Sequence, residues 1–289
     1  MKIIILIPIY NDWQSVLKLL EKINHEVKGI DHSFSITLVN DASTEQFIEN
    51  FPNLSNLNSI QVINLKNNIG HTRCIATGLK HINENQQFDY IIPMDGDGED
   101  RPEEIKLFVE NFNYHPNKTI VGERVKRSEN ILFKICYFFH KILTYTFTGQ
   151  SIKFGNYTCL TKSTIEKMLS DKATWSSFSG SLAKNCNDKA TISSERGKRY
   201  FGPSKMSFFN LIKHSLSIIA VFKTNVIIRS ILFFLIYIFL ISENLSYVTS
   251  IPLIGVLALA ISVLAISKRE NISELNYSLS NINNIDEIK

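Results

Sequence analysis

The sequence predicts an α/β domain with a mostly parallel sheet, followed by a C-terminal transmembrane helical hairpin. Short β-rich runs alternate with helix-like stretches from Met1 to about Tyr114, and this alternation is typical of parallel sheets with right-handed crossovers. Farther along, Val226 to Ser267 is almost entirely apolar, as membrane-spanning helices must be. The 289 residues suffice for one catalytic domain and an appendage.

Strands are expected where β-rich or apolar runs end in turn residues: Ile3–Ile9, Ser35–Val39, Ser59–Leu65, Tyr90–Met94 and Ile120–Glu123. Helices are expected where apolar residues recur at helical spacing: Trp13–His25, Thr72–Ile82, Pro102–Phe112, Ile131–Thr146 and Ser207–Phe222. In parallel sheets, ligands bind beyond the carboxyl ends of the strands. The polar clusters that follow several of these strands are therefore the candidate site.

The hairpin is predicted from two apolar segments, Val226–Ile241 and Leu245–Ile266. The second carries no charge, and the first can extend backwards if Arg229 reaches the membrane surface. Basic residues flank the pair, whereas the connector Ser242–Ser246 carries only Glu243. This charge asymmetry predicts that both ends of the hairpin are cytoplasmic, although a hairpin buried in a protein core is the alternative.

The N-terminal apolar run, Ile3–Ile7, is too short for a signal peptide and ends at Pro8. The N-terminal domain is therefore expected in the cytoplasm, in a multi-pass protein of the inner (cytoplasmic) membrane. We expect a domain over 1–206, an amphipathic interfacial helix over 207–223, two transmembrane helices over 224–267, and a disordered cytoplasmic tail over 268–289. The interfacial helix could equally be an ordinary packed helix.

Composition excludes several classes of protein. The net charge of +4 is too small to indicate nucleic-acid binding, and the sequence has neither a zinc finger nor an arginine-rich arm. The four cysteines are scattered without a CxxC pair, so a cysteine zinc site is not expected and the thiols should be reduced.

The most distinctive motif is the acidic run from Asp95 to Asp100, directly after the Tyr90–Met94 strand. Carboxylates two residues apart on extended backbone point to the same side, so Asp95 and Asp97 can converge on one point. Hard oxygen ligands in this arrangement suit Mg²⁺ or Mn²⁺. The alternative is an acidic turn that caps the helix beginning at Pro102.

Three further clusters lie where strands end or helices begin: Pro8–Asp12, Asn40–Thr44 and Asn67–Arg73. Each is weak by itself, because turns are usually rich in such residues. In the first two, Tyr10 could cover a nucleoside and Asp41 could accept hydrogen bonds from a base.

Together, in this order and spacing, these motifs resemble those of the family 2 glycosyltransferases. The run from Asp95 to Glu103 is similar to the acid-x-acid-x-Gln-x-x-Pro-Glu run of dolichyl-phosphate mannose synthases and bacterial polyisoprenyl-phosphate glycosyltransferases. The segment Arg199–Lys205 resembles their late Arg-x-x-Gly-x-Ser-Lys element. The resemblance extends over roughly Lys2 to Ile266.

The resemblance implies a GT-A fold, which binds nucleotide sugars, and assigns roles to individual residues. The nucleoside and donor would be held by Pro8, Tyr10, Asp12, Asp41 and Asp95, and the metal, Mg²⁺ or Mn²⁺, by Asp95, Asp97 and Glu99. The phosphates would face Arg124, Arg199, Ser204 and Lys205, and catalysis would rest on Asp97, Arg124, Arg199 and Lys205.

The implied activity is inverting transfer of a sugar from a nucleotide sugar, UDP-sugar first, to a polyisoprenyl phosphate at the cytoplasmic membrane face. A lipid phosphate is already ionised and needs no general base, and Ser151–Leu160 offers no carboxylate to serve as one. The alternatives are transfer to a saccharide hydroxyl in polysaccharide synthesis, or a membrane-anchored binding protein without turnover. The expected partners are the donor, the acceptor and the bilayer, with no nucleic acid, and a homo-oligomer is left open.

Two departures from the family pattern bear on the acceptor and the metal. Glu99 stands where the family commonly has glutamine, which adds a negative charge beside the metal. Phe154–Tyr157 stands where the polyisoprenyl enzymes have an Asp-Phe-Arg-like segment, so both the acid and the base are missing.

Overall fold

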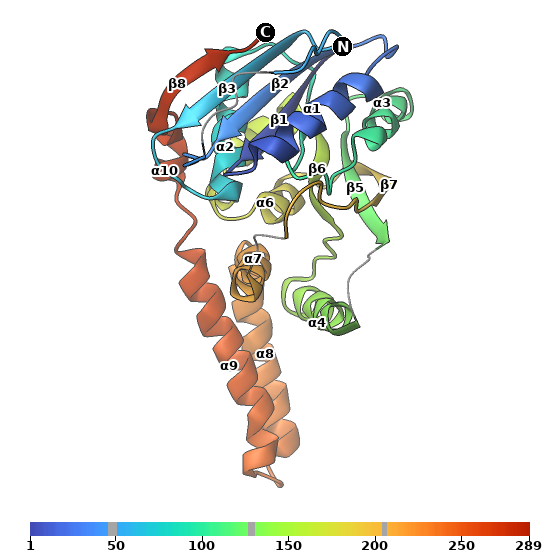
Figure 1. Ribbon diagram of the computed structural model, residues 1–289. Coiled ribbons are helices and arrows are strands. Elements are labelled where there is room, and N and C mark those ends of the chain that lie inside the picture. Colours follow the sequence, from blue (N-terminus) through green and yellow to red (C-terminus); the bar gives the residue numbers. More distant parts are fainter. Residues whose placement is uncertain (46–50, 127–130, 204–206) are drawn as a thin grey trace. The chain divides into compact units, whose positions relative to one another are not determined.

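The computed structural model describes residues 1–289 except 46–50, 127–130 and 204–206 (Figure 1). The chain forms two compact units. One, here called the sheet unit, contains Met1–Ser128, Lys153–Lys205 and Asn271–Lys289. The other, the helical unit, contains Glu129–Ile152 and Met206–Glu270. The expected boundary at residue 206 coincides with one boundary between the units. Two segments do not follow it: Glu129–Ile152 belongs to the helical unit, and Asn271–Lys289 belongs to the sheet unit.

The sheet unit is built on a mixed sheet whose described strands have the order β7-β5-β6-β4-β1-β2-β3-β8. Their bounds are β1 Lys2–Ile9, β2 Ser33–Asn40, β3 Ser59–Leu65, β4 Tyr90–Pro93, β5 Thr119–Lys126, β6 Phe154–Thr161, β7 Lys189–Glu195 and β8 Ile282–Glu287. β1 pairs in parallel with β2 and β4, β2 with β3, and β5 with β7. β6 runs antiparallel to β4 and β5. The mostly parallel sheet predicted from the sequence is confirmed.

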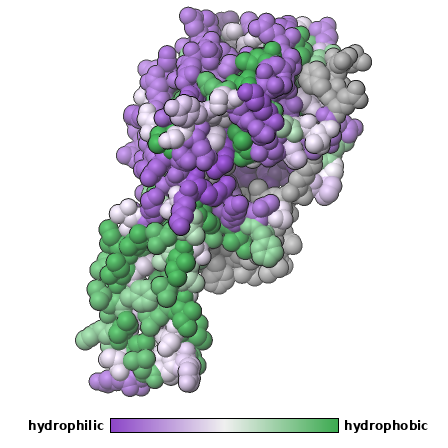
Figure 2. Space-filling view, turned by 90° about the vertical axis from the view of Figure 1, so that its left-hand side faces the viewer, coloured by the Kyte–Doolittle hydropathy of each residue, from purple (hydrophilic) through white to green (hydrophobic). Residues whose placement is uncertain are grey.

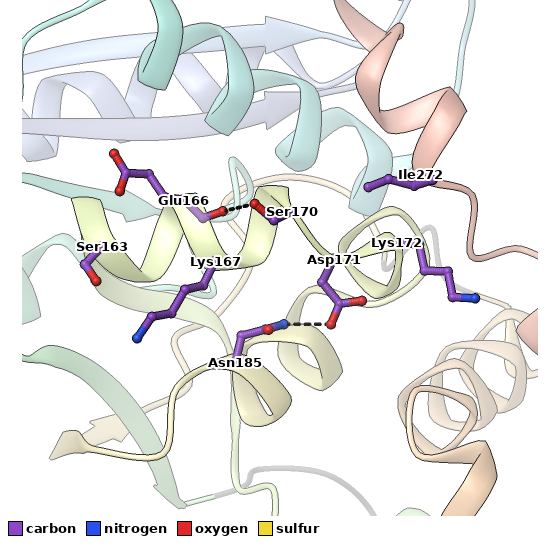
Figure 3. A pocket seen from close by; sticks show the side chains of 8 residues that line it. All are labelled: Ser163, Glu166, Lys167, Ser170, Asp171, Lys172, Asn185 and Ile272. Carbon is purple, nitrogen blue, oxygen red and sulfur yellow. Dashed lines mark hydrogen bonds between the residues drawn. The ribbon is translucent and has the colours of Figure 1, made fainter.

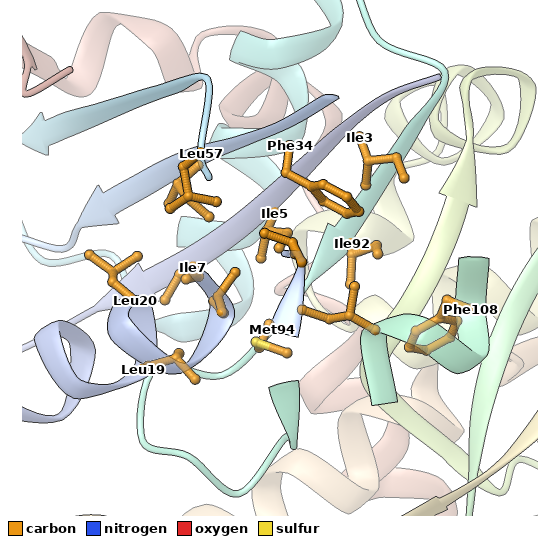
Figure 4. Close-up of a cluster of buried hydrophobic side chains, with 14 of the residues drawn as sticks. Ile3, Ile5, Ile7, Leu19, Leu20, Phe34, Leu57, Ile92, Met94 and Phe108 are labelled. Carbon is orange, nitrogen blue, oxygen red and sulfur yellow. The ribbon is translucent and has the colours of Figure 1, made fainter. Parts of the chain in front are cut away.

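Helices cover both faces of this sheet. They are α1 Trp13–Glu26, α2 His71–Asn85, α3 Ile105–Tyr114, α5 Lys162–Leu169, α6 Phe178–Asn185 and α10 Ile272–Asn276, with 3-10 turns η1 Pro102–Glu104, η2 Lys172–Trp175 and η3 Ser278–Asn281. In β1, Ile5 and Ile7 join the core that contains α1 and α3 (Figure 4), whereas Ile4 and Leu6 join the core that contains α2, α5 and α6. Because alternate side chains point to opposite faces, a strand buried on both faces is apolar throughout.

Gly78 allows α2 to lie close to the sheet. A Cβ atom there would be 2.5 Å from Cδ1 of Leu6 and 2.9 Å from Cγ2 of Val39, and both of these side chains are fully buried. We expect Gly78→Ala to lower the free energy of unfolding by about 1–3 kcal/mol, because the methyl group overpacks the core. Chemical denaturation of the detergent-solubilised protein would measure the loss. Gly255→Ala is the matched control, since no atom lies within 4 Å of its Cβ position; equal stability of the two variants would contradict the prediction.

The helical unit contains α4 Ile131–Thr148, α7 Phe208–Ala220, α8 Lys223–Ile241 and α9 Tyr247–Ser267. The most apolar stretch of α8 has a mean hydropathy of 2.2, and that of the span beginning with α9 has a mean hydropathy of 2.4. Only 17% of the first stretch and 6% of the second are buried. The apolar surface of the two helices is green in Figure 2. Helices of a buried core would be covered, so the alternative of a core hairpin does not fit. α8 and α9 can form a transmembrane hairpin.

Side chains of α8 satisfy the carbonyl groups at the end of α4. Arg229 donates to the carbonyl oxygens of Tyr145 and Thr146 at 3.1 and 2.8 Å, and Asn225 donates to that of Thr148 at 3.0 Å. The last carbonyls of a helix have no partner within the helix, so these bonds attach α4 to α8. Arg229 makes these contacts near the start of α8, and its expected position at the membrane surface stays a prediction.

The residues after the hairpin differ from expectation. We expected 268–289 to be disordered, but the structure places α10, η3 and β8 there and pairs β8 antiparallel with β3. Leu275 is fully buried against Ala76 and Trp175. Asn- and Ser-rich composition indicated disorder because it offers few apolar residues. Here the edge of an existing sheet supplies the backbone partners instead.

Most other predicted elements agree with the structure within a few residues. The expected helix Pro102–Phe112 begins as η1 and continues as α3. The stretch 150–204, which the sequence left unassigned, contains β6, α5, α6 and β7.

Candidate functional site

The candidate site lies beyond the carboxyl ends of β1, β2 and β4. These strands are parallel neighbours at the centre of the sheet, so the segments that follow them meet at one edge. The loops after β1 and β2 are joined directly, because the Asn11 carboxamide oxygen accepts from the backbone N–H of Thr44 at 2.8 Å. The acidic run follows β4.

Asp95 contacts two polar side chains from other elements. Its Oδ1 lies 3.0 Å from Nε2 of His71 at the start of α2, and 3.4 Å from Nδ2 of Asn156 in β6. Burial by itself would raise the pKa of Asp95, but His71, Arg124 and Asn156 together hold it well below its usual value. Desolvation would lower the pKa of His71, but the charges of Asp95, Asp100 and Asp97 together outweigh it and raise that pKa. The two groups therefore favour an ion pair.

Arg199 bridges Asp97 and Asp12. One guanidinium nitrogen lies 2.6 Å from Oδ2 of Asp97, and another lies 2.8 Å from Oδ2 of Asp12. Burial, Asp95 and Glu99 raise the pKa of Asp97 to about 6, against the opposing charge of Arg199. Three residues assigned to the site from the sequence are thus in direct contact.

Glu99 is paired with Arg196, whose Nε donates to its Oε2 at 2.8 Å. The Glu99 side chain is therefore occupied by an ion pair, whereas its backbone N–H donates to Oδ1 of Asp97 at 2.9 Å. Its expected role as a metal ligand would require this pair to open, and it stays a prediction.

Asp100 does not cap the following helix, which was one interpretation of the acidic run. Its side chain is 3% exposed; it accepts from the Asp95 backbone N–H at 2.9 Å and lies 3.4 Å from a guanidinium nitrogen of Arg124. Burial and the charge of Asp95 raise its pKa to about 7. Asp100 and Arg124 thus hold the start of the acidic run, which explains why Arg124 lies near the site.

The segment 196–200 runs alongside the acidic run. The backbone N–H of Tyr200 donates to the Asp97 carbonyl at 2.9 Å, and that of Gly197 donates to the Glu99 carbonyl at 2.8 Å. Gly98 has φ +89° and faces the Tyr200 ring, so a Cβ atom there would be 2.5 Å from Cζ of that ring. Glycine is required at this position both by its backbone conformation and by the close contact.

After β2, Asp41 is 3% exposed, and its two oxygens accept from the backbone N–H groups of Ile69 and Gly70 at 2.8 and 2.9 Å. These bonds fix the segment that enters α2. Tyr10 is 45% exposed at the end of β1, where a ring can cover a base, whereas Pro8 is buried within β1. Contacts of these residues with a nucleoside stay a prediction.

The side chains fit a divalent cation only in part. Among the described residues, no group of three His, Cys, Asp or Glu side chains is arranged to hold a metal ion. Asp95 and Asp97 nevertheless supply carboxylate oxygens, the ligands that Mg²⁺ and Mn²⁺ prefer. A cation bound there would need further oxygens from another molecule, as Mg²⁺ commonly takes from substrate phosphates.

A separate open depression of about 690 Å³ lies in the sheet unit (Figure 3) and is lined by Ser163, Glu166, Lys167, Ser170, Asp171, Lys172, Asn185 and Ile272. Asn185 donates to Asp171 at 3.1 Å across it. None of the residues predicted for the site lines it. We therefore assign the chemistry to the carboxyl ends of the strands.

The structure brings together Asp12, Asp95, Asp97 and Arg199 from widely separated parts of the sequence. Ser204 and Lys205 lie outside the described residues. Sequence reasoning did not assign Arg196, Asp100 or Asn156 to the site, nor His71. Arg196 could have been suspected, because an unusual acid at position 99 needs a nearby cation.

Comparisons with protein families and with known proteins agree on one family. The family model described as "Glycosyl transferase family 2" matches residues 4–165, more than half of the chain. An undecaprenyl-phosphate 4-deoxy-4-formamido-L-arabinose transferase of Photorhabdus laumondii is 29% identical over 219 residues, covering 73% of this chain and 65% of that protein. The protein of the same name from Salmonella choleraesuis is 28% identical, covering 73% and 64%. The chain thus spans slightly less than two thirds of the length of these relatives.

Two solved structures share the fold. Staphylococcus aureus TarS 1–349 in complex with UDP-GlcNAc has a TM-score of 0.54 at 17% identity, covering 97% of this chain and 88% of that one. Glucosyl-3-phosphoglycerate synthase of Mycobacterium tuberculosis, in complex with Mn²⁺, UDP and glucosyl-3-phosphoglycerate, has a TM-score of 0.55 at 12% identity, covering 78% and 79%.

Proposed function

The chain belongs to glycosyl transferase family 2, and we propose that it transfers a sugar from a nucleotide sugar to a polyisoprenyl phosphate at the cytoplasmic face of a membrane. The observation that carries this proposal is the cluster of Asp12, Asp95, Asp97 and Arg199 beyond the central parallel strands. Acids and a guanidinium in one place are what a metal-bound diphosphate requires. UDP is the first choice of nucleotide, as in the complexes of the two solved structures with the same fold.

The residues of this site would act on the leaving group. A divalent cation held by Asp95 and Asp97 would neutralise the diphosphate and stabilise it as it departs. Arg199 would bind phosphate oxygens through its planar fork of donors. Arg124 supports the acidic run through Asp100, 3.4 Å away, and its exposed part can face the same phosphates.

The expected reaction is a direct displacement. An oxygen of the acceptor phosphate bonds to the anomeric carbon as the bond from that carbon to the donor phosphate breaks, so the configuration inverts and the nucleoside diphosphate leaves. No proton must be removed from an ionised phosphate. In β6, Asn156 faces Asp95 and cannot serve as a general base, which favours a phosphate acceptor over a sugar hydroxyl.

The acceptor class is also supported by the membrane hairpin and by the names of the relatives. α8 and α9 are long and apolar enough to cross a bilayer, and a polyisoprenyl phosphate is confined to one. The two relatives from Photorhabdus laumondii and Salmonella choleraesuis are named as undecaprenyl-phosphate 4-deoxy-4-formamido-L-arabinose transferases. Their sugar, 4-deoxy-4-formamido-L-arabinose, is one candidate among the donors to be tested.

Transfer assays on the purified full chain in detergent test the proposal. Radiolabelled UDP-sugars are incubated with Mn²⁺ and with either undecaprenyl phosphate or free saccharides. We expect label in the lipid fraction, dependent on Mn²⁺ or Mg²⁺. Label found only on the saccharides would overturn the acceptor assignment, and binding of the donor without release of UDP in the presence of any acceptor would overturn the enzymatic one.

A further inference from the structure

We propose that Arg199 holds the place of the divalent cation before the donor binds, and that metal binding releases its guanidinium to bind phosphate. This inference rests on the proposed function and concerns the order of events at the same site. Arg199 would then couple loading of the metal to recognition of a phosphate group.

The first support is the geometry of the bridge. The guanidinium lies 2.6 Å from an oxygen of Asp97 and 2.8 Å from an oxygen of Asp12. All three side chains are largely buried, with 16%, 17% and 20% exposed for Arg199, Asp97 and Asp12. Carboxylates held this close in a buried site repel each other unless a cation lies between them. Arg199 supplies the charge at Asp97 that a divalent metal would supply.

The second support is an unsatisfied donor. Nε of Arg199 is buried and has no hydrogen-bond partner among the described residues. A buried donor without an acceptor is energetically unfavourable, and the bridged position leaves this part of the guanidinium unsatisfied. Phosphate oxygens can accept from adjacent donors of one guanidinium. The side chain therefore gains a partner when it moves from the carboxylates to a phosphate.

The third support is that the backbone can stay in place while the side chain moves. The N–H of Tyr200, the next residue, donates to the Asp97 carbonyl at 2.9 Å. This bond keeps the base of the Arg199 side chain beside the acidic run whether or not the bridge is formed. The long arginine side chain can then exchange partners by rotation alone.

The consequence is a competition that can be measured. If Arg199 occupies the carboxylates for about 90% of the time, the apparent affinity for a metal is about tenfold weaker than the affinity of the vacated site. A metal that arrives together with a diphosphate avoids this loss, because the released guanidinium gains a phosphate. Metal and donor would thus bind together, and the acceptor phosphate would follow.

The test is the affinity of the full chain for Mn²⁺ without nucleotide, measured by the electron paramagnetic resonance signal of free Mn²⁺. We expect Arg199→Gln to bind Mn²⁺ about tenfold more tightly than the unmodified protein. Arg101→Gln is the matched control. It removes the same charge one residue after Asp100, from a side chain that pairs with Glu103 and Glu195 at 3.6 Å, and should change the affinity little.

With UDP present, the order of the two proteins' affinities should reverse. Arg199→Gln lacks the guanidinium that would bind phosphate, so it should bind the nucleotide more weakly than the unmodified protein does. Equal Mn²⁺ affinity in Arg199→Gln and the unmodified protein, or equal gains in both variants, would overturn the inference while leaving the proposed function standing. If no form of the protein binds Mn²⁺ at all, both the inference and the metal dependence in the proposed function fail. Thermal unfolding of each variant confirms that it is folded.

Discussion

Replacing Asp97 by asparagine is expected to lower the rate of sugar transfer by about two to three orders of magnitude, because the variant would hold less firmly the divalent cation that neutralises the leaving group. Asparagine keeps the shape of the side chain, and its carboxamide oxygen can still accept from the Glu99 backbone N–H, as Oδ1 of Asp97 does at 2.9 Å. It cannot neutralise Arg199 or hold a divalent cation with the same strength. The loss should therefore appear in turnover and in Mn²⁺ affinity together.

The fold should survive this change. Asp97 lies within a cluster of acids, so removal of one charge relieves repulsion from Asp95 and Glu99, and Arg199 keeps Asp12 as a partner. Asp188→Asn is a suitable control, because Asp188 is 76% exposed and pairs only at the surface with Lys118. Transfer assays and thermal unfolding would be run on both variants. Unimpaired turnover in Asp97→Asn with unchanged Mn²⁺ affinity would refute the assignment of the site.

The parts of this structure that follow from local sequence patterns could be predicted. The unbroken apolar run Ile3–Ile9 predicted a strand, and Ile4 and Ile5 lie in the cores on opposite faces of the sheet. The spacing of Asp95 and Asp97 directly after a strand indicated where a candidate site would lie. Both features depend on period and position along a single element, which a sequence displays directly.

The parts that depend on distant partners could not be predicted. Glu99 was predicted to be a metal ligand, because its charge indicates that a cation lies nearby but does not show that the cation is Arg196. His71 was not assigned to the site from the sequence, yet it lies at the start of α2 and contacts Asp95. The identity of an ion-pair partner is set by the packing of helices on the sheet, and a single sequence does not show that packing.

The folded C-terminal segment is the clearest example of structure that depends on distant partners. β8 is polar by composition, and the strand it pairs with lies far back in the chain: Ile63 of β3 is opposite Ile285. A polar segment is usually disordered because it cannot bury enough apolar surface of its own. Here the edge of the sheet supplies backbone hydrogen-bonding groups for β8, and Leu275 packs against Trp175.

Deletion of Asn271–Lys289 is therefore expected to destabilise the sheet unit strongly. The deletion removes the fully buried Leu275 and the hydrogen bond from Nε1 of Trp175 to Glu274. Burial of one leucine contributes about 1.5–3 kcal/mol, and loss of the β8 ladder adds to this. We expect a loss of about 5 kcal/mol, which lowers the melting temperature by about 10 °C or more in a domain of this size.

Binding of the donor should fall as well, because this segment also holds the entry to α2. Lys66 donates to the Ser280 carbonyl at 2.8 Å and Asn67 pairs with Asn281, just before the N–H groups that Asp41 accepts. Two point variants test whether the stabilisation comes from the buried side chain of Leu275 or from any change in this segment. Leu275→Ala should lose about 2–5 kcal/mol, whereas Tyr277→Ser, at a side chain that is 75% exposed, should lose little. Thermal unfolding and UDP titration of all three proteins would decide the matter: if the deletion melts like the full chain, β8 and α10 contribute nothing to the stability of the sheet unit.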